Sequence, residues 1–220
     1  MILQNFDLLT SAPAEFVRLL IMVAFGLIIA ITVHEFSHAY VAHLRGDETA
    51  RLHGRVSLNP LAHLDWMGTL MLFVAGFGWG KPVPVDSNYL RAPVRLSWAA
   101  VSVAGVFSNL LLAAVISLPI RLGLVGYPFG NFGTLLAYMV QINIVLAVFN
   151  LIPFPPLDGF NILSAALPGK IMRPLVPVMR WGPFILFGLI LIDNFSRTNV
   201  LGTVIGWPVN HLTMGLLGLG

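Results

Sequence analysis

The chain has 220 residues, of which 57% are hydrophobic and only 10% are charged. An average soluble domain has about 25% charged residues, so this composition excludes an ordinary water-soluble protein and predicts an integral membrane protein. The formal net charge is +3, but the basic residues form no dense stripe, and we therefore expect no nucleic-acid partner. The chain has no cysteine, which excludes disulfides and thiolate metal sites.

The length accommodates one membrane-embedded domain, residues 1–220, and no separate soluble module. A cleaved signal peptide is not expected, because no basic segment precedes the first long apolar run. That run predicts a helix over about 15–44, long enough to cross a bilayer with some tilt.

A polar stretch follows over 45–65, and the apolar stretch 66–77 is too short for a confident span. We expect 66–77 to form a re-entrant or interfacial segment, or a pair of strands. Residues 81–95 are polar and rich in proline, and the alternation around Val83 and Val85 predicts a short strand.

The second half of the chain is mostly apolar. Two clear spans are expected, and a proline cluster at 153–156 ends the second of them. A short helix and two further apolar segments follow, the first of which is expected to begin near Pro183. The prediction is an all-α polytopic membrane protein with about five or six membrane segments and a small cytosolic strand and loop insertion. The predicted elements are 96–118, 134–152, 157–167, 183–192 and 200–219.

Lys and Arg positions predict the orientation in the membrane. If the first helix runs from outside to inside, the stretches 45–95 and 168–181 are cytosolic and hold nine of the twelve basic residues. Only Arg18, Arg121 and Arg197 are then external. We therefore expect a multi-pass protein of the cell (inner or plasma) membrane with an external amino terminus.

The first predicted helix contains His34-Glu35-Phe36-Ser37-His38. Ionisable groups at membrane depth are costly and are typical of functional sites. His34 and His38 are four residues apart, so on a helix they share one face and are spaced to bind one metal ion. Glu35 lies about 100° further round, where it is placed to act on water rather than to bind the metal. The alternative is a pair of buried histidines that only hydrogen-bond.

Two histidines leave a catalytic zinc site incomplete, because such sites usually have three protein ligands. Asp158 follows the proline cluster in the run from Asn150 to Gly159, and a broken helix at membrane depth is tolerated where it lines a cavity. Spacing alone leaves two interpretations of Asp158 open, namely a third ligand and an ordinary aspartate at a cytosolic helix start. We expect His43, His53, His63 and His211 to take no part in metal binding.

Several motifs together resemble the site-2 proteases, which are intramembrane zinc metalloproteases, and in particular their short prokaryotic members without a PDZ or CBS module. The resemblance covers about residues 17–168. It rests on the HExxH at 34–38 and on the NxxPxxPxDG pattern at 150–159. Further matching segments are 54–60, His63 with Asp65, 80–85, and the GxxxN pattern of Gly105 to Asn109.

The resemblance implies a three-helix catalytic core, here about 15–44, 96–119 and 133–152, in a domain core of about 15–168 with extra C-terminal segments over about 175–219. It implies one Zn²⁺ per chain held by His34, His38 and Asp158, with Glu35 as general base, nearer the cytosolic face. It further implies that strands of the loop 45–95 pair with an unwound substrate. Asn150 matches an asparagine implicated near the site, where it would contact the oxyanion or the substrate backbone; an interhelical hydrogen bond is the alternative. For Asn109 we favour packing or an interhelical hydrogen bond.

The expected function is an intramembrane zinc endopeptidase whose partners are transmembrane-helix proteins and the lipid bilayer. Two other classes are compatible with buried histidine and carboxylate groups: a metal or proton translocator, and a catalytically silent scaffold that binds membrane helices. Glu35 favours the protease over the translocator, which has no particular need of an acid beside the first ligand. The sequence does not predict the substrate or the oligomeric state.

Overall fold

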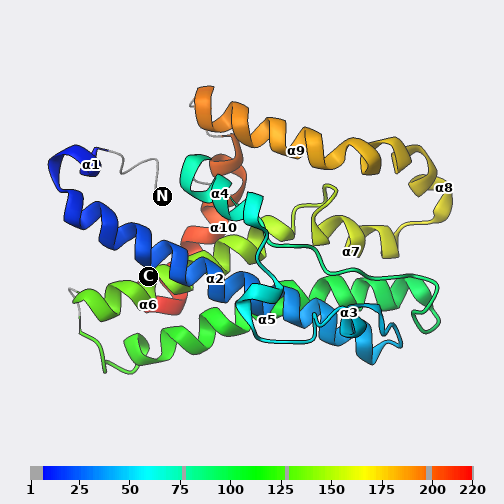
Figure 1. The fold of residues 1–220 in the computed structure, drawn as a ribbon, viewed down its shortest axis with the longest axis horizontal. Coiled ribbons are helices and arrows are strands. Elements are labelled where there is room, and N and C mark those ends of the chain that lie inside the picture. Colours follow the sequence, from blue (N-terminus) through cyan, green and yellow to red (C-terminus); the bar gives the residue numbers. More distant parts are fainter. Residues whose placement is uncertain (1–6, 76–77, 127–128, 197–199, 220) are drawn as a thin grey trace.

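The computed structural model describes residues 7–75, 78–126, 129–196 and 200–219. The chain is built from helices joined by loops (Figure 1). Within the described residues the α-helices are α1 (Leu8–Ser11), α2 (Pro13–Leu44), α3 (Thr49–Leu52), α4 (Trp66–Ala75), α5 (Val94–Arg121), α6 (Asn131–Asn150), α7 (Asp158–Ala166), α8 (Gly169–Met172), α9 (Val176–Ser196) and α10 (Val200–Leu217), with 3₁₀ turns at Pro60–Ala62 and Arg173–Leu175.

Among the described residues, four helices are long and apolar enough to cross a membrane: α2, α5, α6 and α10. Their outer surfaces are apolar as well, since Ile21, Phe107 and Leu111 are 62%, 61% and 53% exposed. A helix that is apolar on all sides fits a hydrocarbon surrounding rather than water. The prediction of an all-α membrane protein is therefore confirmed.

The three predicted core helices are α2, α5 and α6, which lie side by side with alternating direction (Figure 1). Small residues permit the close approach of their backbones, and Ala30, Ala113 and Ala147 are fully buried where the helices meet. Helix α10 extends this bundle by packing against α5 and α6, where Val209 and Leu217 contact the buried Ile144 region. The core helices begin and end within about three residues of the predicted bounds.

The stretch 45–95 contains less strand than expected. Its pairing, among described residues, is one isolated antiparallel bridge between Leu64 and Gly80, and the segment around Val83 and Val85 has no partner strand. The apolar segment 66–77 forms the ten-residue helix α4 up to Ala75, and residues 76–77 lie outside the described part. The predicted start of a helix at Pro183 is wrong, because α9 already begins at Val176 and Pro183 lies inside it. Pro177, the second residue of α9, occupies the position where proline is tolerated at a helix start.

Candidate metal centre

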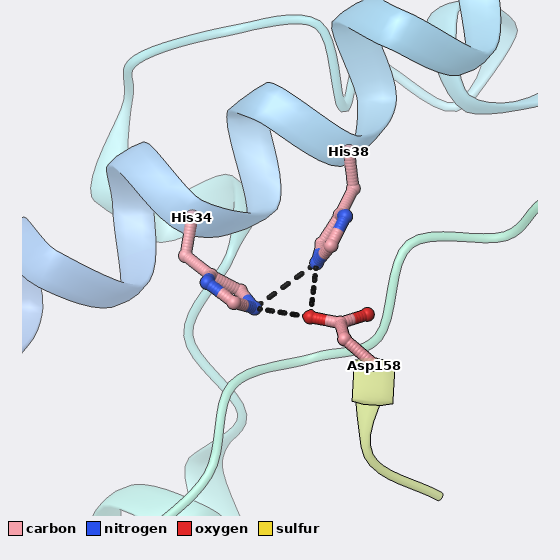
Figure 2. Close-up of side chains that lie close together, drawn as sticks. All are labelled: His34, His38 and Asp158. Atoms are coloured by element: carbon pink, nitrogen blue, oxygen red, sulfur yellow. Dashed lines mark hydrogen bonds and ion pairs between the residues drawn. The ribbon is translucent and has the colours of Figure 1, made fainter. Parts of the chain in front are cut away.

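His34 and His38 project from the same face of α2, as their spacing predicts. Their side chains are buried, and the two Nε2 atoms lie 3.0 Å apart. The ring planes are nearly perpendicular, at 89°. Both Nε2 atoms therefore face one point, which is what a shared ligand position requires (Figure 2).

Asp158 reaches the same point from a distant part of the chain. Its Oδ2 atom lies 3.3 Å from His34 Nε2 and 3.2 Å from His38 Nε2 (Figure 2). The prolines at 153, 155 and 156 prevent α6 from continuing, and the chain turns back so that α7 begins at Asp158. The first turn of a helix favours a carboxylate, because the helix dipole is positive there.

The second ring nitrogen of each histidine has a partner that can only accept a hydrogen bond. His38 Nδ1 lies 2.7 Å from the backbone oxygen of Val101. His34 Nδ1 lies 2.6 Å from Oδ1 of Asn109, whose amide nitrogen donates to the Ala30 backbone oxygen and to Asn143 Oδ1. The two Nδ1 atoms must therefore carry the protons, and in a neutral imidazole this leaves Nε2 as a bare acceptor.

Three acceptors thus converge in a buried space. Two neutral Nε2 lone pairs and the Asp158 Oδ2 atom, which has no hydrogen-bond partner, face one another without a donor. Such an arrangement is costly unless a proton or a metal ion lies between the three atoms. Two imidazoles and one carboxylate are the donor set of a catalytic zinc site, so these residues fit the implied metal. Within the described residues they form the one cluster of this kind.

Gly105 leaves the space that the histidine rings occupy. A Cβ atom at this position would lie 2.4 Å from His38 Nε2 and 2.7 Å from His34 Cε1. Gly105 and Asn109 are four residues apart on α5, so one face of this helix supplies both the gap and the partner of His34. The Gly105–Asn109 spacing was the sequence signal for this face, but it did not predict contact with His34. The prediction that Asn109 bonds between helices agrees with its contacts to α2 and α6, one of which is the partner of His34 Nδ1.

Glu35 lies beside this cluster but does not belong to it. It lines the same cavity, and its Oε1 atom lies 3.6 Å from the place where a Cβ on Gly80 would stand. This agrees with the predicted position of Glu35 to one side of the metal ligands on α2. The carboxylate is therefore free to act on a molecule in the cavity.

The cavity has a volume of about 660 Å³ and extends from the three ligands to α9. Its walls are mainly apolar, and Trp98, Phe149, Phe184 and Phe187 contribute to them. The loop segment from Gly80 to Val85 forms one edge. The site therefore combines a few polar groups with an apolar surface long enough to hold several residues of a peptide.

Asn150 lines this cavity, but its amide nitrogen donates to the Leu146 backbone oxygen within α6. The remaining histidines lie away from the cluster, as expected. His43 approaches Glu48, and the ring nitrogens of His53, His63 and His211 pair with backbone oxygens.

The chain is similar to known proteins over most of its length. The family model "Peptidase family M50" matches residues 127–189. The chain is 39% identical over 189 residues to "Putative zinc metalloprotease YwhC" of Bacillus subtilis (strain 168), covering 83% of each protein. It is 30% identical over 194 residues to "Putative zinc metalloprotease Rip2" of Mycolicibacterium smegmatis, covering 86% of this chain and 73% of the relative. No solved structure matches the chain significantly.

Substitution Gly105→Ala is expected to lower the metal content of the purified protein sharply, because the added methyl group occupies the space of the His38 ring. The matched control is Gly206→Ala in α10, where an added Cβ meets nothing within 4 Å. Elemental mass spectrometry of both variants measures the effect. An unchanged metal content in Gly105→Ala would contradict the assigned geometry.

Substitution Asn109→Leu is expected to weaken metal binding about 10- to 100-fold, the usual effect of removing the group that orients a ligating histidine. The reason is the loss of the acceptor for His34 Nδ1. Competition with a chelator of known affinity measures the change. Asn143→Leu removes only a neighbour of Asn109 and should have the smaller effect; the reverse order would show that Asn109 does not orient His34.

Proposed function

Because the chain belongs to peptidase family M50, the site-2 proteases, and is therefore a membrane metalloprotease, we propose that it hydrolyses peptide bonds within or near the transmembrane helices of membrane-protein substrates. The observation that carries this proposal is the convergence of His34, His38 and Asp158 on one buried point, supplied by α2 and by the turn after α6. A hydrolytic site built into membrane helices suits substrates that are themselves in the membrane.

In this proposal His34, His38 and Asp158 hold one zinc ion. A zinc ion held there would supply Lewis-acid chemistry and would lower the pKa of water at the site toward neutrality. Glu35 accepts a proton from the attacking water and then donates it to the nitrogen of the leaving amine. Asn109 and the Val101 carbonyl keep the histidine rings in the tautomer that binds metal through Nε2.

A transmembrane helix must unwind before its peptide bonds can be cut, since its backbone groups are engaged within the helix. The segment 82–85 supports this step because it lines the cavity and, among the described residues, has no partner strand; the prolines at 82 and 84 favour an extended backbone in the residues before them. An unwound substrate strand would gain main-chain hydrogen bonds there, as in other cases of strand addition. Asn150, which lines the same cavity, is proposed to contact the substrate backbone or the oxyanion.

The two alternatives receive less support. A translocator has no particular need of an acid beside the first ligand, whereas this cavity is lined by Glu35 and bordered by a loop edge suited to a peptide. A silent scaffold needs neither a complete ligand set nor Glu35 beside it. We further propose that the site lies nearer the cytosolic face and that the amino terminus is external, because the basic residues gather at the end of the molecule where α2 ends and α5 begins.

The purified wild-type protein is expected to contain about one zinc ion per chain, and Asp158→Ala should lose most of it because one of three ligands is gone. Elemental mass spectrometry after zinc reconstitution measures the ratio. Asp7→Ala, at an exposed aspartate near the amino terminus, is the control. Zinc retained by Asp158→Ala would remove Asp158 from the ligand set, and absence of zinc from the wild type would overturn the protease proposal.

Glu35→Gln is expected to reduce cleavage about 10²- to 10⁴-fold while zinc content stays unchanged, because only the proton-accepting group is removed. The probe is a single-span reporter with a Gly-Pro pair in its membrane segment, reconstituted with the protein in liposomes. Glu15→Gln is the matched control on the same helix, since Glu15 is exposed and pairs with Arg18. Equal cleavage by Glu35→Gln and wild type would exclude Glu35 as the base.

A further inference from the structure

The loop segment from Lys81 to Asp86 is held at both ends by buried charged side chains. At its start, the guanidinium of Arg55 donates to the Lys81 backbone oxygen, and the Lys81 amide donates to the His63 backbone oxygen over 2.7 Å. At its end, the Asp86 amide donates to Oδ2 of Asp47 over 2.7 Å. Arg55 is 3% exposed and Asp47 is fully buried. Two buried side chains, Arg55 and Asp47, therefore fix the segment at its two ends.

Between these anchors the backbone has free hydrogen-bonding groups. Within the described part of the chain, no protein group pairs with the backbone of Val83 or Val85. Pro82 and Pro84 have no N–H, so the only amide donors along this stretch are those of Val83 and Val85. In an extended chain, alternate residues present their N–H and C=O groups to the same side. One side of the segment can pair with a strand, and the side of the prolines cannot.

Arg55 also lies near the proposed base. Burial lowers the pKa of its guanidinium, and the attraction of the Glu35 carboxylate opposes that shift. The Nε atom of Arg55 has no hydrogen-bond partner although it is buried. One side chain thus contacts the start of the free segment and lies within electrostatic range of Glu35.

Gly80, the residue before this segment, packs tightly against α2. A Cβ on Gly80 would lie 2.6 Å from Ile31 Cγ2 and 3.2 Å from the His63 backbone oxygen. The start of the segment is therefore placed against α2 by Gly80, by the His63 pairing of Lys81 and by Arg55, and a shift of Lys81 would move the free segment relative to Glu35.

We infer that Arg55 is a positioning residue for substrate: by holding the Lys81 carbonyl, it fixes the Val83–Val85 edge at the register that presents the scissile bond to Glu35. This inference rests on the proposed function and adds the residue that sets the alignment of the bound strand. Arg55 acts through the segment and does not itself contact the reacting atoms.

The experiment measures binding and turnover separately with the single-span reporter described above. Binding is measured in the Glu35→Gln background, where the reporter stays intact, with a fluorescent label on the reporter. Arg55→Met removes the donor, and Arg55→Lys retains the charge and one donor group. Arg51→Met is the matched control, because Arg51 lies in the same loop region with its side chain 61% exposed. Zinc content is measured for every variant.

Arg55→Met is expected to weaken reporter binding about 10- to 100-fold, the range that loss of a charge-assisted hydrogen bond supports. Turnover at saturating reporter should fall as well, because a strand bound out of register presents its scissile bond poorly to Glu35, whereas zinc content should stay close to wild type; Arg55→Lys should restore part of the affinity. Val83→Pro should weaken binding as well, and combining it with Arg55→Met should add little, because both act on the same edge. Val83→Ala, which keeps the amide, should weaken binding less than Val83→Pro.

Unchanged binding in Arg55→Met, or full additivity with Val83→Pro, would overturn the inference. A fall in turnover with unchanged binding would also overturn it, since that result would assign Arg55 to Glu35 alone. If Arg55→Met fails to fold, the reporter affinity of Arg55→Lys is used in its place. An affinity below that of wild type supports the inference, and an affinity equal to wild type overturns it. Failure of the wild type to bind or cleave the reporter while it holds zinc would instead count against the proposed function.

Discussion

The structure depends on one electrostatic constraint: three acceptor atoms face one another in a buried space. The constraint is produced by hydrogen bonds outside the cluster, because Asn109 and the Val101 carbonyl each take the proton-bearing side of a histidine ring. Gly105 keeps the space open, and the proline turn delivers Asp158. Each of the three core helices contributes to this arrangement, directly or through Asn143 on α6. The bundle is therefore organised around a position that a bound metal ion would satisfy.

The sequence predicted those parts of the site that depend on local geometry. The shared face of His34 and His38 follows from the period of a helix, and the side position of Glu35 follows from the same period. The core helix bounds were close because long apolar runs and prolines mark them directly. Asp158 was open on spacing alone, and only its resemblance to a family motif singled it out.

The remainder depends on contacts between distant segments, which periodicity does not report. Asn109 and Asn150 are both asparagines of apolar helices, and nothing local distinguishes the partner of His34 from the residue at the cavity wall. The sequence also did not predict that Arg55 is buried. Its burial depends on a contact with Lys81, which lies 26 residues further along the chain. The expected strand near Val83 is not formed, because among the described residues this segment has no partner strand.

The hydrogen-bond path from His34 through Asn109 to Asn143 joins α2, α5 and α6. Interhelical hydrogen bonds of this kind contribute on average only about 0.6 kcal/mol each within a membrane, so they add little to the cohesion of the bundle by themselves. Their geometry, however, is the one that the ligated histidine requires. By thermodynamic linkage, whatever stabilises the ligated ring also stabilises the packing of the three helices, in proportion to the logarithm of the free metal concentration. The supply of metal thus becomes a determinant of the free energy of unfolding of the bundle.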